Sequence, residues 1–207
     1  MNRTYSAMAA SMIVCAAGTA ARAGLTFSFS DGPGLTALDA IDPVKAAGIR
    51  SGAALAAARW EALWADDVTI KLALDYDASL PALGAAFSTF DPAGTPYPAV
   101  KDAMGLDATS FHDFVATGHL QAGPELKMIR NSIAPPSYMP IMDPGGSINN
   151  TFMDITSSNL KALGITPGHS GGAGSDGTLK FGSAAFDFDP SDGITPGTYD
   201  FVGVTLH

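Results

Sequence analysis

Apolar and polar residues alternate in two short segments near the start of the chain, at residues 25–29 and 68–74. Such alternation puts one face of a strand in a core and the other in water, so both segments are predicted as β-strands. Residues 44–65, between them, are rich in alanine, the strongest helix former. Apolar residues recur there at helical spacing: Leu55, Ala58, Trp60, Leu63 and Trp64. This spacing predicts a long helix with one large apolar face.

Turn-forming residues interrupt the pattern at four places. Residues 31–34 read DGPG and predict a turn after the first strand. Prolines and glycines recur between residues 81 and 98 and predict a loop. Residues 133–146 hold four prolines and two glycines, so this segment is expected to be irregular. Residues 169–177 are rich in glycine and are expected to form a surface loop.

Three shorter helices are expected between these breaks. Two of them are predicted at residues 100–106 and 110–117. Ser110 is the expected N-cap of the second, because Asp113 follows three residues later and can close a capping box. The third, at residues 156–164, begins with threonine and serines and ends on a glycine, which is typical of a capped helix.

The last third of the chain returns to strand-like patterns. Residues 178–181 predict a strand, and residues 186–189 are a candidate for another. A turn is expected at residues 190–196, and Asp200 is positioned to cap a helix that begins at Phe201. The order of strand, long helix, strand, mixed middle, strand and helix predicts an α+β fold with one sheet and a backing helix.

The first 23 residues have the organisation of a secretory signal peptide. Arg3 gives a positive start, residues 7–17 are apolar, and residues 21–23 supply the small residues that precede cleavage. The apolar run is shorter than the roughly 20 residues that span a membrane. It also lacks the amphipathic pattern of a buried helix, and small residues do not precede Cys15 as they would in a lipoprotein. We therefore expect a secreted protein, extracellular or periplasmic.

Removal of the signal peptide leaves one expected domain at residues 24–207. The whole chain has 11 Lys and Arg against 20 Asp and Glu, a net charge of −9. Because Arg3 and Arg22 leave with the signal peptide, the mature net charge becomes −11. An acidic surface disfavours nucleic acids and anionic membranes as partners. Cys15 is the one cysteine and also leaves, so disulfides and cysteine-ligated metals are excluded from the mature chain.

Three short sequence motifs close to the end of the chain are its most specific functional signal. They read GTLKFG at residues 177–182, FDFDPSDG at 186–193 and YDFVGVTLH at 199–207. Together they resemble the approach to the H-E-x-x-H motif of zincin-type zinc metalloproteases, and more closely that of a bacterial family of exported metalloproteases. The helix and strand at residues 60–74 also resemble the start of that family. The resemblance implies that His207 is the first zinc ligand.

That motif works through helical spacing. Two histidines four residues apart lie on one helix face and reach one Zn²⁺, and the intervening glutamate acts on the metal-bound water. This sequence contains only the first histidine, His207. The resemblance therefore implies a zincin-like mixed sheet with a long backing helix, incomplete because the active-site helix is cut. It implies a peptide or protein substrate for the family. In this chain it implies no catalytic residue, weak zinc binding and no peptide hydrolysis.

Two structural expectations accompany the resemblance. In zincins the edge strand before the active-site helix pairs with an extended substrate, and residues 178–181 are expected to be that strand, with an ordinary edge strand as the alternative. A seven-residue helix at 201–207 is below the roughly 12 residues that isolated helices need. We therefore expect this end to be poorly ordered or extended.

The other histidines offer weaker metal sites. His112 and His119 are seven residues apart, which suits one helix face, but solvated surface histidines are the simpler interpretation. His169 and Asp176 flank a glycine-rich loop that resembles the structural metal loops of matrix metalloproteases; a flexible linker is the alternative.

Three aspartates in the FDFDPSDG phrase form an acidic cluster: Asp187, Asp189 and Asp192. Carboxylate oxygens bind Ca²⁺, so calcium is a second candidate ion, although the spacing excludes an EF-hand. An acidic turn on a solvated edge explains the same residues.

Two functions remain open at the level of sequence. The first is a truncated, secreted, zinc-dependent metallopeptidase-like protein. The second is a non-catalytic secreted or cell-surface binding module, which suits the acidic charge and the glycine-rich loops. No nucleophile-elbow, phosphate-loop or dinucleotide motif supports another enzyme class.

Overall fold

The computed structural model of the chain describes residues 24–131, 139–143, 145–166 and 174–207. The expected signal peptide, residues 1–23, lies outside these ranges, and so does His169. The described residues combine helices with a mixed β-sheet, which confirms the α+β class.

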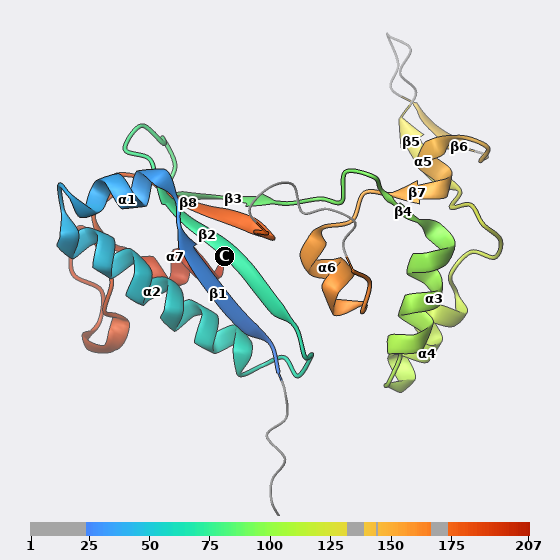
Figure 1. Cartoon of the computed structure of the whole chain (residues 1–207), viewed down its shortest axis with the longest axis horizontal. Coiled ribbons are helices and arrows are strands. Elements are labelled where there is room, and N and C mark those ends of the chain that lie inside the picture. Colours follow the sequence, from blue (N-terminus) through green and yellow to red (C-terminus); the bar gives the residue numbers. More distant parts are fainter. Residues whose placement is uncertain (1–23, 132–138, 144, 167–173) are drawn as a thin grey trace, which may run out of the picture.

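The central sheet has four strands in the order β1-β2-β8-β3 (Figure 1). They are β1 (Thr26–Asp31), β2 (Thr69–Tyr76), β8 (Gly177–Phe181) and β3 (Gly84–Ser88). The first three run parallel, whereas β3 pairs antiparallel with β8. The predicted strand at 178–181 is therefore present but lies inside the sheet. The prediction that residues 178–181 form the edge strand was wrong. β3 formed within the segment predicted as a loop, and it pairs with the side of β8 that was expected to be open.

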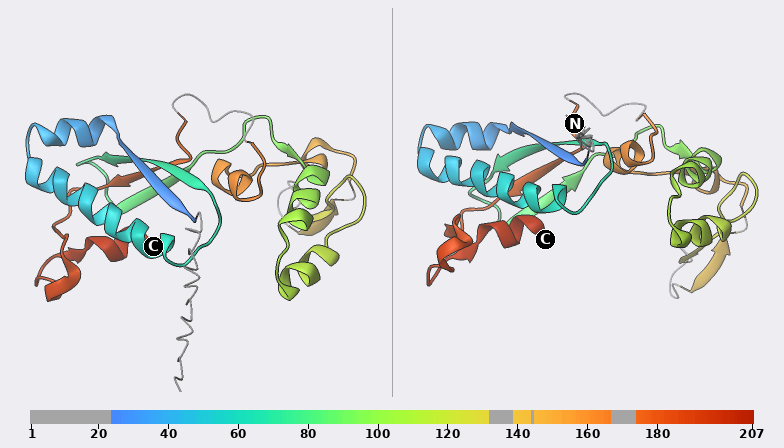
Figure 2. Two further views of the ribbon diagram at one scale, coloured as in Figure 1. Left: turned by 60° about the horizontal axis from the view of Figure 1, so that its bottom comes forward. Right: turned by 90° about the horizontal axis from the view of Figure 1, so that it is seen from below.

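Helices connect and cover this sheet. α1 (Pro33–Asp39) and α2 (Pro43–Glu61) join β1 to β2, and α7 (Phe201–Leu206) ends the chain. α2 and α7 lie side by side on one face of the sheet (Figure 2). Their buried side chains meet those of the strands in one core: Leu35, Leu38, Ala46, Ile49, Ala53, Leu74, Phe181 and Phe201. This core holds the last helix of the chain against the sheet.

The long helix was predicted in the right place, but its buried face was predicted wrongly. Its core side consists mostly of small residues: Ala46, Ile49, Gly52, Ala53, Ala56 and Ala57. Leu55 remains 49 % exposed, and Leu63 and Trp64 follow the end of the helix and are exposed. α7 approaches α2 too closely for large side chains between them, so the small residues face inward.

The described residues between 91 and 155 form a second lobe, inserted in the chain between β3 and β8 (Figure 1). A single antiparallel bridge between Phe90 and Thr156 closes its base. In its described residues the lobe contains three helices and two small two-stranded sheets. The helices are α3 (Tyr97–Asp107), α4 (Phe111–Gly118) and α5 (Ile148–Thr151). The sheets pair β4 (Thr95–Pro96) with β7 (Phe152–Met153), and β5 (Met128–Asn131) with β6 (Pro140–Asp143). β6 lies in the segment that was predicted to be irregular, where proline content hid its strand pattern.

Several local predictions are confirmed. α3 and α4 match the two short helices predicted in the middle of the chain. Ser110 and Asp113 form the capping box of α4, with Ser110 accepting from the backbone of Asp113. α6 (Ser157–Ala162) is capped by Thr156. Within the described ranges no helix is both long and apolar enough to cross a bilayer.

The approach to α7 is a compact turn. β9 (Phe186–Asp187) pairs in parallel with β10 (Tyr199–Asp200), and a short 3-10 helix at Pro190–Asp192 connects them. Asp200 is the N-cap residue of α7, as predicted, but its side chain makes no capping hydrogen bond. Packing rather than capping therefore fixes the start of this helix.

Candidate functional site

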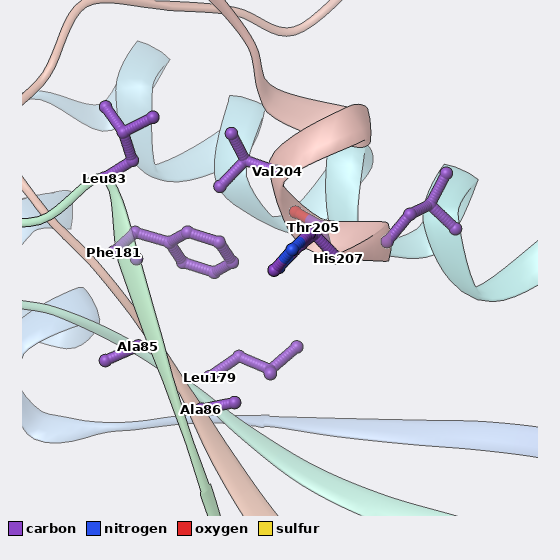
Figure 3. Close-up of a pocket in the computed structure, with 10 residues that line it drawn as sticks. Leu83, Ala85, Ala86, Leu179, Phe181, Val204, Thr205 and His207 are labelled. Carbon is purple, nitrogen blue, oxygen red and sulfur yellow. The ribbon is translucent and has the colours of Figure 1, made fainter.

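A groove of about 580 Å³ lies between α7 and the β3 side of the sheet. Its walls come from three segments that are far apart in the sequence: residues 83–86 with β3, two residues of β8, and the end of α7 (Figure 3). Leu83, Leu179, Phe181 and Val204 give it an apolar surface. His207 is the one ionisable side chain in the lining. The groove therefore presents a single imidazole beside an apolar channel.

α7 owes its place to aromatic packing around Phe201, which is fully buried. The centroid of its ring lies 4.6 Å from that of Phe181, 4.8 Å from Phe188 and 5.3 Å from Phe186. Val202, the next residue, is also fully buried. The expectation of a poorly ordered or extended end was wrong. Burial of these side chains supplies the stabilisation that a short isolated helix lacks.

His207 lies at the C-terminal end of α7, one turn after Val204. Its backbone N–H donates to the carbonyl of Gly203 at 3.2 Å, so the helical path continues to this residue. The side chain is exposed and borders the groove (Figure 3). The histidine singled out by sequence thus lies at the rim of the groove.

The opposite wall of the groove is the edge strand β3. Gly84 pairs with Phe181, Ala86 with Leu179, and Ser88 with Gly177. Within the described chain β3 has no second neighbour, so its outer backbone edge is open. An open antiparallel edge beside a groove can accept an extended peptide through main-chain hydrogen bonds. Residues 178–181, predicted as the edge strand, instead form the interior strand β8, because strand order depends on long-range pairing.

The residues of this site do not complete a zinc centre. A zinc site needs three or four ligands, and the groove offers one imidazole. His112 and His119 lie on or next to α4 in the second lobe. Across the described ranges no group of three or more His, Cys, Asp or Glu side chains could hold a metal ion. His207 by itself is a single donor.

The acidic cluster is engaged in its own turn. The Asp187 carboxylate accepts from the backbone of Thr195 at 2.8 Å and of Asp189 at 3.0 Å. The Asp189 carboxylate accepts from both the backbone and the hydroxyl of Ser191. Hydrogen bonds from Thr195 lower the pKa of Asp187, and those from Ser191 lower the pKa of Asp189. This geometry favours the acidic-turn interpretation over a calcium site.

Asp176 is a buried carboxylate whose role the sequence did not reveal. Its oxygens accept from the Ser157 hydroxyl at 2.8 Å, the backbone of Lys71 at 2.7 Å and the Lys161 ammonium at 2.5 Å. Burial acts to raise the pKa of Asp176, but these hydrogen bonds outweigh it and the pKa is lowered. Asp176 ties α6 to the sheet, which is a structural role and leaves it unsuited to the metal loop suggested with His169.

Comparison of the chain with protein-family models, with curated proteins and with solved structures finds no match.

Proposed function

We propose that this chain is the N-terminal part of an exported, zincin-like, zinc-dependent metallopeptidase, with His207 as the first ligand of its zinc site. The observation that carries the proposal is that α7 delivers His207 to the rim of an apolar groove bordered by the open edge of β3. The sequence resemblance assigns a zinc ligand to this position. The groove is a place where a peptide can lie next to that ligand.

The order of elements supports the proposal. A long helix, α2, connects two parallel strands and backs the sheet, and an antiparallel edge strand lies beside the helix that ends in His207. The mixed sheet and the backing helix agree with what the resemblance implied. Under this proposal α7 is the start of the active-site helix. An extended peptide on β3 would run past His207, because both border the same groove.

The described residues supply only one zinc donor, so this chain on its own is expected to bind zinc weakly and to leave peptides intact. Its own groove residues would bind and orient an extended peptide. Leu179, Phe181 and Val204 offer contact to apolar side chains, and β3 offers backbone hydrogen-bonding groups.

The deciding experiment has a genetic and a biochemical arm. The DNA beyond codon 207 is read in all three frames, and a Glu-x-x-His continuation in any frame supports the proposal. The extended protein is then produced and tested for zinc-dependent cleavage of casein, beside a variant with His207→Ala. Cleavage that survives His207→Ala, or a stop codon followed by unrelated sequence, would contradict the proposal. Cleavage of casein by residues 24–207 alone would contradict the predicted inactivity.

A non-catalytic secreted binding module is the second candidate. The groove favours it in one respect, because its lining is mostly apolar and holds no ionisable residue other than His207. A binding module would hold an extended peptide along β3 without zinc. Peptide binding that is unchanged by a chelator and by His207→Ala, together with no zincin motif downstream, would support this function over the first.

A further inference from the structure

The second lobe contains a groove of its own, lined by other residues than the one beside His207. Its volume is about 500 Å³, within the roughly 300–1,000 Å³ of ligand pockets in proteins. The loop at residues 92–94 forms one side, and Leu126 and Met128 form another. α5 and β7 complete the wall with residues 148–154.

Specific hydrogen bonds hold these walls together. The backbone N–H of Leu126 donates to the carbonyl of Asn150 at 2.8 Å, and the side-chain amide of Asn150 donates to the carbonyl of Leu126 at 2.8 Å. Asn150 is 1 % exposed, so this pair is shielded from water. Met153 is fixed by pairing with Thr95 between β7 and β4. The groove is thus pre-formed, which lowers the entropic cost of filling it.

The lining combines exposed apolar surface with one acidic group. Ile148 is 77 % exposed and Phe152 is 41 % exposed. Met128 adds a flexible, polarisable side chain that adapts to different apolar partners. Asp154 is the one charged residue of the lining, and none of the ion pairs within the described ranges involves it. The groove therefore offers apolar side chains beside polar surface, to which Asn149 contributes, and an exposed carboxylate that makes no ion pair within the described ranges.

We propose that this groove binds a short apolar peptide segment that carries a lysine or arginine, with the cation placed at Asp154. Charge complementarity selects this occupant: the lining has a negative charge and no positive one, and the whole chain has a net charge of −9. The same charge disfavours an anionic lipid surface and a second copy of the chain. This site is independent of zinc and of His207, so it goes beyond the function proposed above.

Fluorescence anisotropy with two labelled hexapeptides tests the site on the purified chain. The first peptide contains two leucines, a phenylalanine and a single lysine, and the second has glutamate in place of the lysine. We expect saturable binding of the lysine peptide below about 1 mM, and binding of the glutamate peptide that is weaker by about ten-fold. Asp154→Asn should weaken binding of the lysine peptide by about two- to five-fold and reduce the difference in affinity between the two peptides.

Two further variants separate the groove from the general surface. Ile148→Ser removes an exposed apolar side chain from the wall of the groove and should weaken binding of both peptides by about ten-fold. Ile129→Ser is the matched control, because Ile129 is 72 % exposed and does not line the groove. Thermal unfolding of each variant verifies its fold, and the exposed Asp154→Asn change provides the test even if Ile148→Ser does not fold. Absence of saturable binding, equal affinity for both peptides, or an unchanged affinity in Asp154→Asn would each overturn the proposal.

Discussion

The ring of Phe201 occupies the space beside Gly52 where a side chain would lie. An ideal Cβ at Gly52 would be 2.3 Å from Cδ1 of Phe201, well inside van der Waals contact. One turn earlier, a Cβ at Gly48 would be 2.6 Å from the ring of Phe188. These two glycines let α7 and the turn before it pack against α2, and this packing sets the position of His207 at the groove.

Substitution at Gly52 should therefore lower stability despite the better helix propensity of the new residue. Alanine gains up to about 1 kcal/mol in an exposed helix, whereas overpacking costs about 1–3 kcal/mol. We expect Gly52→Ala to reduce the free energy of unfolding by about 1 kcal/mol, measured by urea denaturation.

Gly105 in α3 is the matched control for Gly52. A Cβ at Gly105 meets nothing within 4 Å, so Gly105→Ala should raise stability by about 0.5–1 kcal/mol. If both substitutions stabilise the protein equally, α7 does not pack closely against α2 at Gly52.

Loss of the Asp176 carboxylate should lower the free energy of unfolding by more than loss of an exposed charged side chain does. Asp176→Ala leaves the buried Ser157 hydroxyl without its acceptor. It also removes the buried carboxylate that pairs with the Lys161 ammonium, which keeps its hydrogen bond to the Thr69 carbonyl. We expect a loss of about 3 kcal/mol in the free energy of unfolding, measured by chemical denaturation. Asp66→Ala, at an exposed aspartate, serves as the control and should change stability by less than about 0.5 kcal/mol.

Stability should also depend on pH through Asp176. Its folded pKa is lowered, so the unfolded chain binds the proton more tightly than the folded protein does. The stabilisation is fully present above the ordinary aspartate pKa of about 4 and is lost as the pH falls through the lower folded pKa. Urea midpoints measured from pH 6 down to acid should show this loss. In Asp176→Asn, the urea midpoint should fall less steeply with decreasing pH than in the wild-type protein. If the two proteins show the same pH dependence, Asp176 is not a source of it.

Processing of the N-terminus tests the export prediction. When the whole chain is expressed in a bacterium with a general secretion pathway, the exported protein should begin at Gly24, as determined by intact mass. Ala21→Leu combined with Ala23→Leu replaces the small residues that the peptidase needs and should leave the unprocessed chain in the cell. Retention of residues 1–23 in the wild-type exported protein would refute the prediction.

Local sequence signals predicted several elements correctly, but not α1, which begins at Pro33 inside the segment predicted as a turn. The capping box at Ser110 and Asp113 depends on residues three positions apart, and it formed as predicted. The alternation at residues 68–74 likewise produced β2. β3 escaped prediction because Gly84 and two alanines carry little alternating pattern, and its strand conformation comes from pairing with β8.

The sequence by itself determined the helices α2, α3, α4 and α6, the strands β1, β2 and β8, and the acidic charge. It also identified His207 as the candidate zinc ligand. Those features depend on neighbouring residues or on composition. Only the tertiary structure decided the order of the strands, the open edge at β3, the small-residue face of α2 around Gly52, and the groove that His207 borders. These depend on contacts between segments far apart in the chain, where the packing of Phe201 rather than any local propensity selects the conformation.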